Sequence, residues 1–150
     1  MGVINLQPLE NMSSNFAAKQ TTDLNPKLVN PDLDASKLLG RWLNTNRNTS
    51  GITECSIEMQ GERCSVSITG AGKDSALQWP TVNTTLLVNL EEEAKQQSVA
   101  LVADFEFDFM KAETHIRVNK GVLVIVLFIT FTDDSGRSNY VNREFFYREA

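Results

Sequence analysis

Three carboxylates alternate with other residues in one stretch of the chain: Asp104, Glu106 and Asp108. In a β-strand every second side chain points to the same side, so the three carboxylates share one face. Like charges held close together favour keeping one carboxyl protonated, which general acid–base catalysis requires. Asp104 and Glu106 are therefore the first catalytic candidates. The competing interpretation, which we favour, is a solvated outer face of a strand whose phenylalanines point inward.

His115 is the single histidine of the sequence, and on a strand it shares a face with Glu113 and Arg117. His115 and Arg117 are the second pair of catalytic candidates, and a surface or interface histidine is the simpler interpretation. Hydrolysis by a nucleophile–histidine pair is not expected, because the sequence has no Gly-x-Ser-x-Gly segment and both cysteines look buried.

The hairpin after His115 decides which residues share its face. Asn119-Lys120-Gly121 is typical of a three-residue turn in which the glycine supplies a positive φ. That turn places His115 opposite Ile125 and Arg117 opposite Leu123. The face of Thr114, Ile116 and Val118 then looks like packed interior. The His115 face carries an aliphatic row that water should not touch, formed by Leu123, Ile125, Leu127 and Ile129.

Three surroundings are open for the His115 face: an outer surface under the N-terminal segment, a dimer interface, or the wall of a cavity. The N-terminal segment is too polar to cover the whole aliphatic row. We therefore expect a homodimer.

Cys55 and Cys64 lie on neighbouring predicted strands joined by a tight turn at Gln60-Gly61. A two-residue loop there places Ile57 opposite Cys64 and makes the cysteines diagonal neighbours on one apolar face. Diagonal neighbours are usually too far apart for a disulfide, so we expect two buried, reduced thiols. Two thiols and one histidine do not form a zinc site, and no metal or cofactor is expected.

The composition narrows the class of protein that carries these residues. The net charge is −5 and basic residues do not cluster, which argues against nucleic-acid binding. The longest apolar run, residues 122–129, is far shorter than a membrane-spanning helix. The N-terminus lacks the charged and apolar regions of a secretory signal. We expect a cytoplasmic protein with no membrane partner.

The chain divides into an N-terminal arm, residues 1–36, and one domain, residues 37–150. The arm is polar, with a short amphipathic helix expected near Leu9–Phe16 and turns at Asn25-Pro26 and Asn30-Pro31. From Leu38 onward the apolar period is two. Strands are expected at residues 38–47, 52–59, 63–69, 77–90 (one or two strands, interrupted at Pro80), 99–109, 114–119, from 122 onward, and 139–148.

Strands joined directly by short turns are antiparallel, and closure into a barrel hides the edges of such a sheet. We therefore predict an all-β fold, a single antiparallel up-and-down β-barrel of eight or nine strands with an N-terminal arm. An open β-sandwich is the alternative.

Gly40-Arg41-Trp42, the preceding residues 33–39 and an arginine in the last strand resemble the lipocalin-like (calycin) β-barrels, over residues 33–149. The resemblance implies that Trp42 packs at the closed end of the barrel with an arginine, Arg143 or Arg148, across its ring. Residues 42–46 with Gly51-Ile52, and residues 131–140, are also similar to small bacterial calycin-like proteins without a defined activity.

A barrel of this size encloses one small-ligand cavity, so the predicted function is binding of a small, mostly apolar molecule. Candidate wall residues are Trp42, Met59, Trp79, Phe105, Phe107, Phe128 and Tyr140. Two other functions stay open. One is a cofactor-independent cyclase or isomerase acting on a biosynthetic intermediate, with Asp104, Glu106, His115 and Arg117 as weak catalytic candidates. The other is a protein-interaction module that uses the apolar strand.

Overall fold

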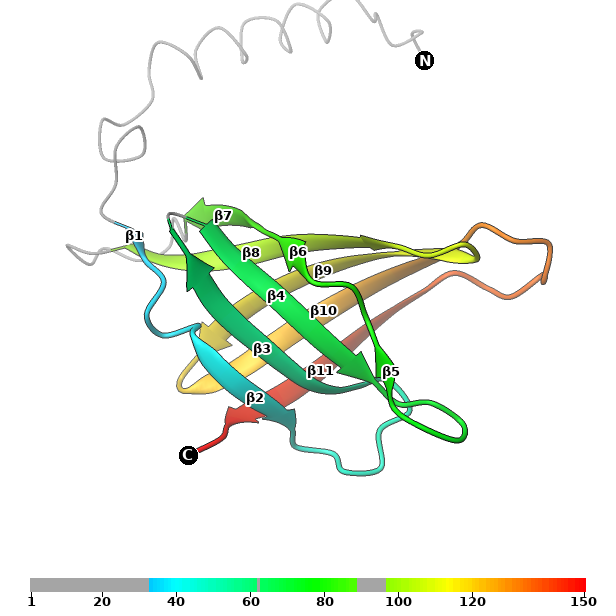
Figure 1. Cartoon of the computed structure of the whole chain (residues 1–150), viewed down its shortest axis with the longest axis horizontal. Coiled ribbons are helices and arrows are strands. Elements are labelled where there is room, and N and C mark those ends of the chain that lie inside the picture. Colours follow the sequence, from blue (N-terminus) through cyan, green and yellow to red (C-terminus); the bar gives the residue numbers. More distant parts are fainter. Residues whose placement is uncertain (1–32, 62, 89–96) are drawn as a thin grey trace, which may run out of the picture. The chain divides into compact units, whose positions relative to one another are not determined.

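The computed structural model describes residues 33–61, 63–88 and 97–150 (Figure 1). This part of the chain is all β-structure, without a helix. The helix expected near Leu9–Phe16, the rest of the arm before Leu33, and residues 89–96 lie outside the described residues. The strands are β1 (Leu33–Asp34), β2 (Gly40–Asn44), β3 (Ile52–Gln60), β4 (Arg63–Gly70), β5 (Leu77–Gln78), β6 (Val82–Asn83), β7 (Thr85–Val88), β8 (Gln97–Glu106), β9 (Met110–Asn119), β10 (Val122–Phe131) and β11 (Tyr140–Arg148).

The strands form one sheet in the order β1-β8-β9-β10-β11-β2-β3-β4-β5, with β6 also paired to β4 and β7 to β8. Each pairing is antiparallel except the short parallel pair β1–β8. The prediction of an all-β, antiparallel fold is confirmed. Hydrogen bonds between the described strands do not close the sheet, although β6 lies beside β8 and the Trp79 ring centroid lies 5.0 Å from that of Phe105.

The inward face of every long strand contributes to one apolar core, as the alternation of the sequence predicts. On β8 the alternate residues from Val99 to Phe105 are buried, whereas Asp104 and Glu106 are exposed. Thr114 is the polar exception on β9: it is fully buried, and its hydroxyl donates to the carbonyl of Ala103 at 2.9 Å. The largest fully buried side chains are Trp42, Phe105, Phe146, Leu38, Ile52, Ile57, Ile68, Leu101, Ile116, Leu123, Ile125 and Val66.

The predicted three-residue turn between β9 and β10 is wrong. Asn119 pairs with Val122, and the two residues between them, Lys120 and Gly121, have φ angles of 52° and 80°. Positive φ at both central positions is the geometry of a type I′ hairpin turn. A non-glycine residue such as Lys120 adopts a positive φ uncommonly, and the expected turn assigned a positive φ only to Gly121.

The shorter turn shifts the β9–β10 register by one residue and reverses the faces of β10. Ile125 is paired with Ile116, and His115 is paired with Val126. The expectation of an exposed aliphatic row is therefore wrong: the row lies in the core, at most 4% exposed, and consists of Leu123, Ile125, Leu127 and Ile129. His115 and Arg117 are on the outer face, with Val122, Val124, Val126 and Phe128.

The β3–β4 register differs by two residues from the expected one, which leaves the faces of both strands unchanged. Cys64 is paired with Met59 and Cys55 with Ile68, so Ile57 is not opposite Cys64 and the cysteines are not diagonal neighbours. Gly61, with a φ of 66°, lies inside the turn, whereas Gln60 still pairs with Arg63. Both cysteines are buried and free, as expected.

Trp42 and Arg148 fill one end of the sheet, where the chain enters β2 and leaves β11. The Trp42 ring is 1% exposed, and its Nε1 donates to the Leu38 carbonyl at 2.9 Å. The guanidinium carbon of Arg148 lies 4.7 Å from the ring centroid, and Arg148 also donates to the Lys37 carbonyl. The predicted contact between an arginine of the last strand and Trp42 is confirmed for Arg148. Arg143 instead lies 5.6 Å from the ring of Phe145.

Gly40 is explained by its backbone conformation. Its φ is 123°, which residues with a side chain rarely adopt. An added Cβ would make only ordinary van der Waals contact with the Arg148 side chain, at 3.6 Å, so the Arg148 contact itself does not require the glycine.

Candidate functional site

The end of the sheet opposite Trp42 carries four connections, because antiparallel strands return to the same end at every second turn. They are residues 45–51, 71–76, 107–109 and 132–139 (Figure 1). Neighbouring connections are tied by backbone hydrogen bonds: Ala71 N donates to Gly51 O at 2.8 Å, and Thr132 N donates to Phe109 O at 2.9 Å. Binding residues are often placed on such loops, because a rigid sheet positions them.

Three of the predicted wall residues meet inside this end. The Trp79 ring lies edge-on to Phe105 and to Phe107, with centroid distances of 5.0 and 5.2 Å, and Phe109 continues the group 6.0 Å from Phe107. Trp79 and Phe105 are buried, Phe107 is half-buried and Phe109 is exposed. The group therefore runs from the core to the surface. Trp79 also covers Gly70, where an added Cβ would lie 3.0 Å from the indole nitrogen.

The other four predicted wall residues lie elsewhere. Trp42 is at the opposite end, under Arg148. Met59 is 42% exposed beside the β3–β4 turn, with its sulfur 3.2 Å from that of Cys64. Phe128 is on the outer face because of the β9–β10 register, and its ring lies 5.0 Å from the His115 ring. Tyr140 is 49% exposed at the start of β11, and its ring centroid lies 6.2 Å from that of Phe131.

The predicted catalytic candidates all lie on the exposed outer face of β8 and β9. Asp104 is paired across the strands with Glu113, and Glu106 is 3.9 Å from the Lys111 ammonium. His115 Nε2 is 3.7 Å from the Glu113 carboxylate. Arg117 is exposed on the same face. None of the four points into the core, so their arrangement fits the solvated-face interpretation.

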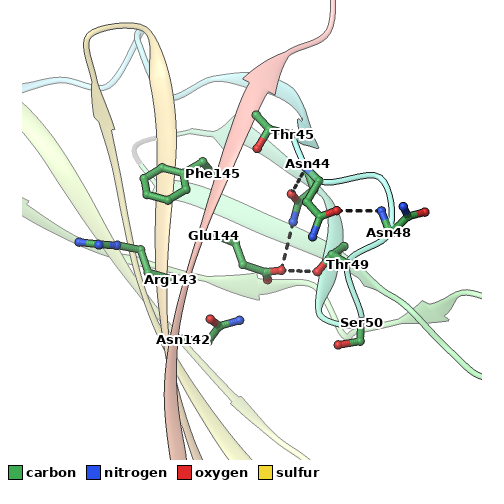
Figure 2. A pocket seen from close by; sticks show the side chains of 10 residues that line it. Asn44, Thr45, Asn48, Thr49, Ser50, Asn142, Arg143, Glu144 and Phe145 are labelled. Carbon is green, nitrogen blue, oxygen red and sulfur yellow. Dashed lines mark hydrogen bonds between the residues drawn. The ribbon is translucent and has the colours of Figure 1, made fainter.

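The sequence reasoning missed Glu144, the one buried charged side chain among the described residues. It lies on the inward face of β11, two positions before the buried Phe146. Figure 2 shows its carboxylate turned toward Asn44 and the β2–β3 loop. The carboxylate accepts hydrogen bonds from Asn44 Nδ2 at 3.1 Å, from Ile52 N at 3.0 Å and from the Thr49 hydroxyl. Buried charges need such partners, and here the donors come from the β2–β3 loop and from the strand ends on either side of it.

Gly51 makes room for this carboxylate. A Cβ at Gly51 would lie 2.7 Å from one carboxylate oxygen of Glu144, which is closer than van der Waals contact allows. The only signal in the sequence is the alternation of β11, which places Glu144 on the same face as Phe146.

Short polar side chains hold the backbone of residues 45–51. Asn44 Oδ1 accepts from Asn46 N at 2.7 Å, and Asn46 Oδ1 accepts from Asn48 N at 3.0 Å. The Thr49 hydroxyl accepts from Gly51 N at 3.0 Å. Asparagine and threonine side chains commonly fix turns in this way. The loop is therefore shaped by its own residues and by Glu144.

Two clefts of about 340 Å³ each flank this loop. The first is polar and lies between the loop and β11. Figure 2 shows Asn142 and Glu144 on the side of β11 that faces the loop, whereas the side chains of Arg143 and Phe145, which also line the cleft, lie on the other side of the strand. The second lies on the side of Leu43, Arg47 and Tyr147.

The cysteines are not poised for nucleophilic chemistry. Burial raises the pKa of the Cys55 thiol to about 12, with a smaller contribution from nearby Glu54, and burial also raises the pKa of Cys64. A thiol is nucleophilic as its thiolate, so both groups are kept in the unreactive form. Among residues 33–61, 63–88 and 97–150, no three His, Cys, Asp or Glu side chains are grouped to hold a metal ion.

No family model, no curated protein and no solved structure matches this chain. Within the described residues there is no helix of the length and apolarity needed to cross a membrane. Function is therefore inferred from the arrangement of the chain's own residues.

Proposed function

We propose that this protein binds a small, mostly apolar molecule inside a lipocalin-like β-barrel, at the end that carries the four loops. The observation that supports this most is the meeting of Trp79, Phe105 and Phe107 at that end. Aromatic rings offer a large apolar area with defined edges and faces, and small-molecule sites are mostly lined by such groups.

The barrel itself is part of the proposal. The strand path ends at β5 on one side and at β1, next to β8, on the other. Near these ends β6, which pairs with β4, lies beside β8, and Trp79 contacts Phe105 of β8. The Arg148–Trp42 contact is the one that the lipocalin-like resemblance implies. With that contact filling one end, the loop-bearing end is the natural opening.

Binding is favoured over catalysis because the four catalytic candidates face outward and Glu144 is engaged by three donors. The interaction-module alternative loses its main support, because the aliphatic row of β10 lies in the core. We propose that the ligand is held by ring contacts and by exclusion of water.

The test is titration with an environment-sensitive apolar fluorophore, N-phenyl-1-naphthylamine. We expect saturable binding that Phe107→Ala weakens at least five-fold, because an aromatic contact contributes about 0.5–1.5 kcal/mol beyond its buried area. Phe128→Ala is the matched control, since it removes the same ring from the outer face and should leave the affinity unchanged. Absence of saturable binding, or equal loss in both variants, would exclude the proposed site. Native mass spectrometry of the purified protein would show a copurified ligand.

A further inference from the structure

The polar cleft beside the β2–β3 loop has features of a second binding site. Its ten lining residues are Phe145, which is apolar, and nine polar or charged residues that divide into two groups. Asn44, Asn46, Thr49 and Glu144 hold the loop through the hydrogen bonds described above. The other group has side chains without a hydrogen bond or ion pair to the described part of the chain: Thr45, Asn48, Ser50, Asn142 and Arg143.

The hydrogen-bonding groups that remain open are mostly neutral. Asn48 and Asn142 offer amides, and Thr45 and Ser50 offer hydroxyls, so each of the four can donate and accept. In Figure 2, Ser50 and Asn142 extend from the loop and from β11 toward the region of the Glu144 carboxylate. A ligand whose own groups both donate and accept would match them, and hydroxyl groups do both.

The charges in the cleft argue against an ion as its ligand. The Glu144 carboxylate already accepts three hydrogen bonds, which leaves little capacity for a cation. Arg143 is the single cationic residue of the lining, and its side chain is turned to the other side of β11, where its guanidinium carbon lies 5.6 Å from the Phe145 ring centroid.

The size and the fixed shape of the cleft agree with a small ligand. Its volume of about 340 Å³ lies at the small end of the range for ligand pockets, about 300–1,000 Å³. The anchored loop would lose little conformational freedom on binding, which favours affinity.

From these groups we infer that the cleft formed by residues 44–46, 48–50 and 142–145 binds a neutral, hydroxyl-rich molecule of the saccharide class. The site is separate from the proposed apolar site and does not depend on it.

The test is a ¹H–¹⁵N correlation titration of the full chain with four methyl glycosides: those of glucose, galactose, mannose and N-acetylglucosamine. We expect saturable shifts of the amides of residues 45–50 and 142–145 with at least one glycoside. Asn142→Ala and Ser50→Ala should each weaken that binding at least five-fold. Asn83→Ala, on exposed β6, is the matched control and should bind as wild type.

The spectra of the variants report folding directly, so a loss of affinity with an unchanged dispersion of peaks is interpretable. No saturable shift in the cleft with any of the four glycosides would overturn the inference. So would shifts confined to residues near Trp79, or wild-type affinity in Asn142→Ala. Because the naphthylamine probe reports the other site, failure here and failure of the proposed function are distinguishable.

Discussion

Glu144 and Gly51 form a pair whose energies can be separated by a double-mutant cycle. Glu144→Ala removes the acceptor of three donors: Asn44 Nδ2, the Thr49 hydroxyl and Ile52 N. A hydrogen bond to a charged group contributes about 1.5–3 kcal/mol to stability. A buried donor that is left without an acceptor destabilises the folded state further, because its desolvation is no longer compensated. Thr49 is only half-buried and can bind water instead. We therefore expect Glu144→Ala to lower the free energy of unfolding by about 3–5 kcal/mol.

Gly51→Ala should be destabilising only while Glu144 is present. The new methyl group would lie 2.7 Å from one carboxylate oxygen, so either the carboxylate or the loop must move. Overpacking of this kind costs about 1–3 kcal/mol. In the Glu144→Ala background the space is empty, and the same glycine substitution should cost less than about 0.5 kcal/mol.

The assay is urea denaturation of the wild type, the two single variants and the double variant, followed by tryptophan fluorescence. Glu58→Gln, an exposed carboxylate on β3, is the control and should change stability by less than about 0.5 kcal/mol. A coupling free energy below about 0.5 kcal/mol would refute the close approach of Gly51 and Glu144. A loss below about 1 kcal/mol for Glu144→Ala would show that water replaces the carboxylate.

The Trp42 end, the cysteines and the outer face of β10 predict further effects. In denaturant melts, Trp42→Ala should lower the free energy of unfolding by about 3–5 kcal/mol and Arg148→Ala by about 1 kcal/mol. A decrease below about 1 kcal/mol for Trp42→Ala would contradict the packing role of Trp42. The folded-state pKa of Cys55, raised to about 12 from 9.0, means that its contribution to stability is complete below pH 9.0 and lost as pH rises toward 12; Cys55→Ala should remove that part of the alkaline loss. Thiol reagents should label Cys55 and Cys64 slowly without denaturant, and rapid stoichiometric labelling would contradict their burial. The aliphatic row on which the homodimer was expected lies in the core, so only the outer face of β10, with Val122, Val124, Val126 and Phe128, could pair two copies. A homodimer formed through that face should be dissociated by Phe128→Glu in light scattering, and a monomeric wild type would contradict the expected dimer.

The period-two pattern was sufficient to predict most of the sheet, because one face of each strand packs in the core and the other meets solvent. On β8, Phe105 is buried and Asp104 is exposed, as their alternation predicts. The contact of Trp42 with an arginine of the last strand was implied by the resemblance to the lipocalin-like barrels, which left Arg143 and Arg148 as alternatives. The pairing of β11 with β2 brings Arg148, and not Arg143, to Trp42.

The β9–β10 register was not predictable in the same way, because it depends on the conformation of one lysine. Lys120 adopts a positive φ, and that choice moves every residue of β10 to the other face. Ile125 consequently lies in the core, so Ile125→Glu would test folding and not association. Because β10 is apolar on both faces, its own sequence does not indicate which face is buried. The error in the predicted register therefore could not be recognised from the sequence.

Glu144 escaped sequence reasoning because its partners are remote. In the stretch from Arg143 to Phe146, charged and aromatic residues occur on both faces, so the pattern alone does not reveal a buried carboxylate. Its donors belong to residues 44–52, about a hundred positions earlier in the chain. Only the pairing of β11 with β2 brings the two segments together.

The two ends of the sheet differ in what β11 supplies to them, and this difference bears on where a ligand can bind. At one end Arg148 packs on the Trp42 ring and donates a hydrogen bond to the Lys37 carbonyl, before β2. The polar and the apolar groups at this end are therefore both engaged in internal contacts. At the other end Glu144 anchors one loop, and its neighbours Asn142 and Arg143 keep their hydrogen-bonding groups open. The same strand thus fills one end and leaves the other chemically available. For that reason we place both proposed binding sites, the aromatic interior and the polar cleft, at the loop-bearing end.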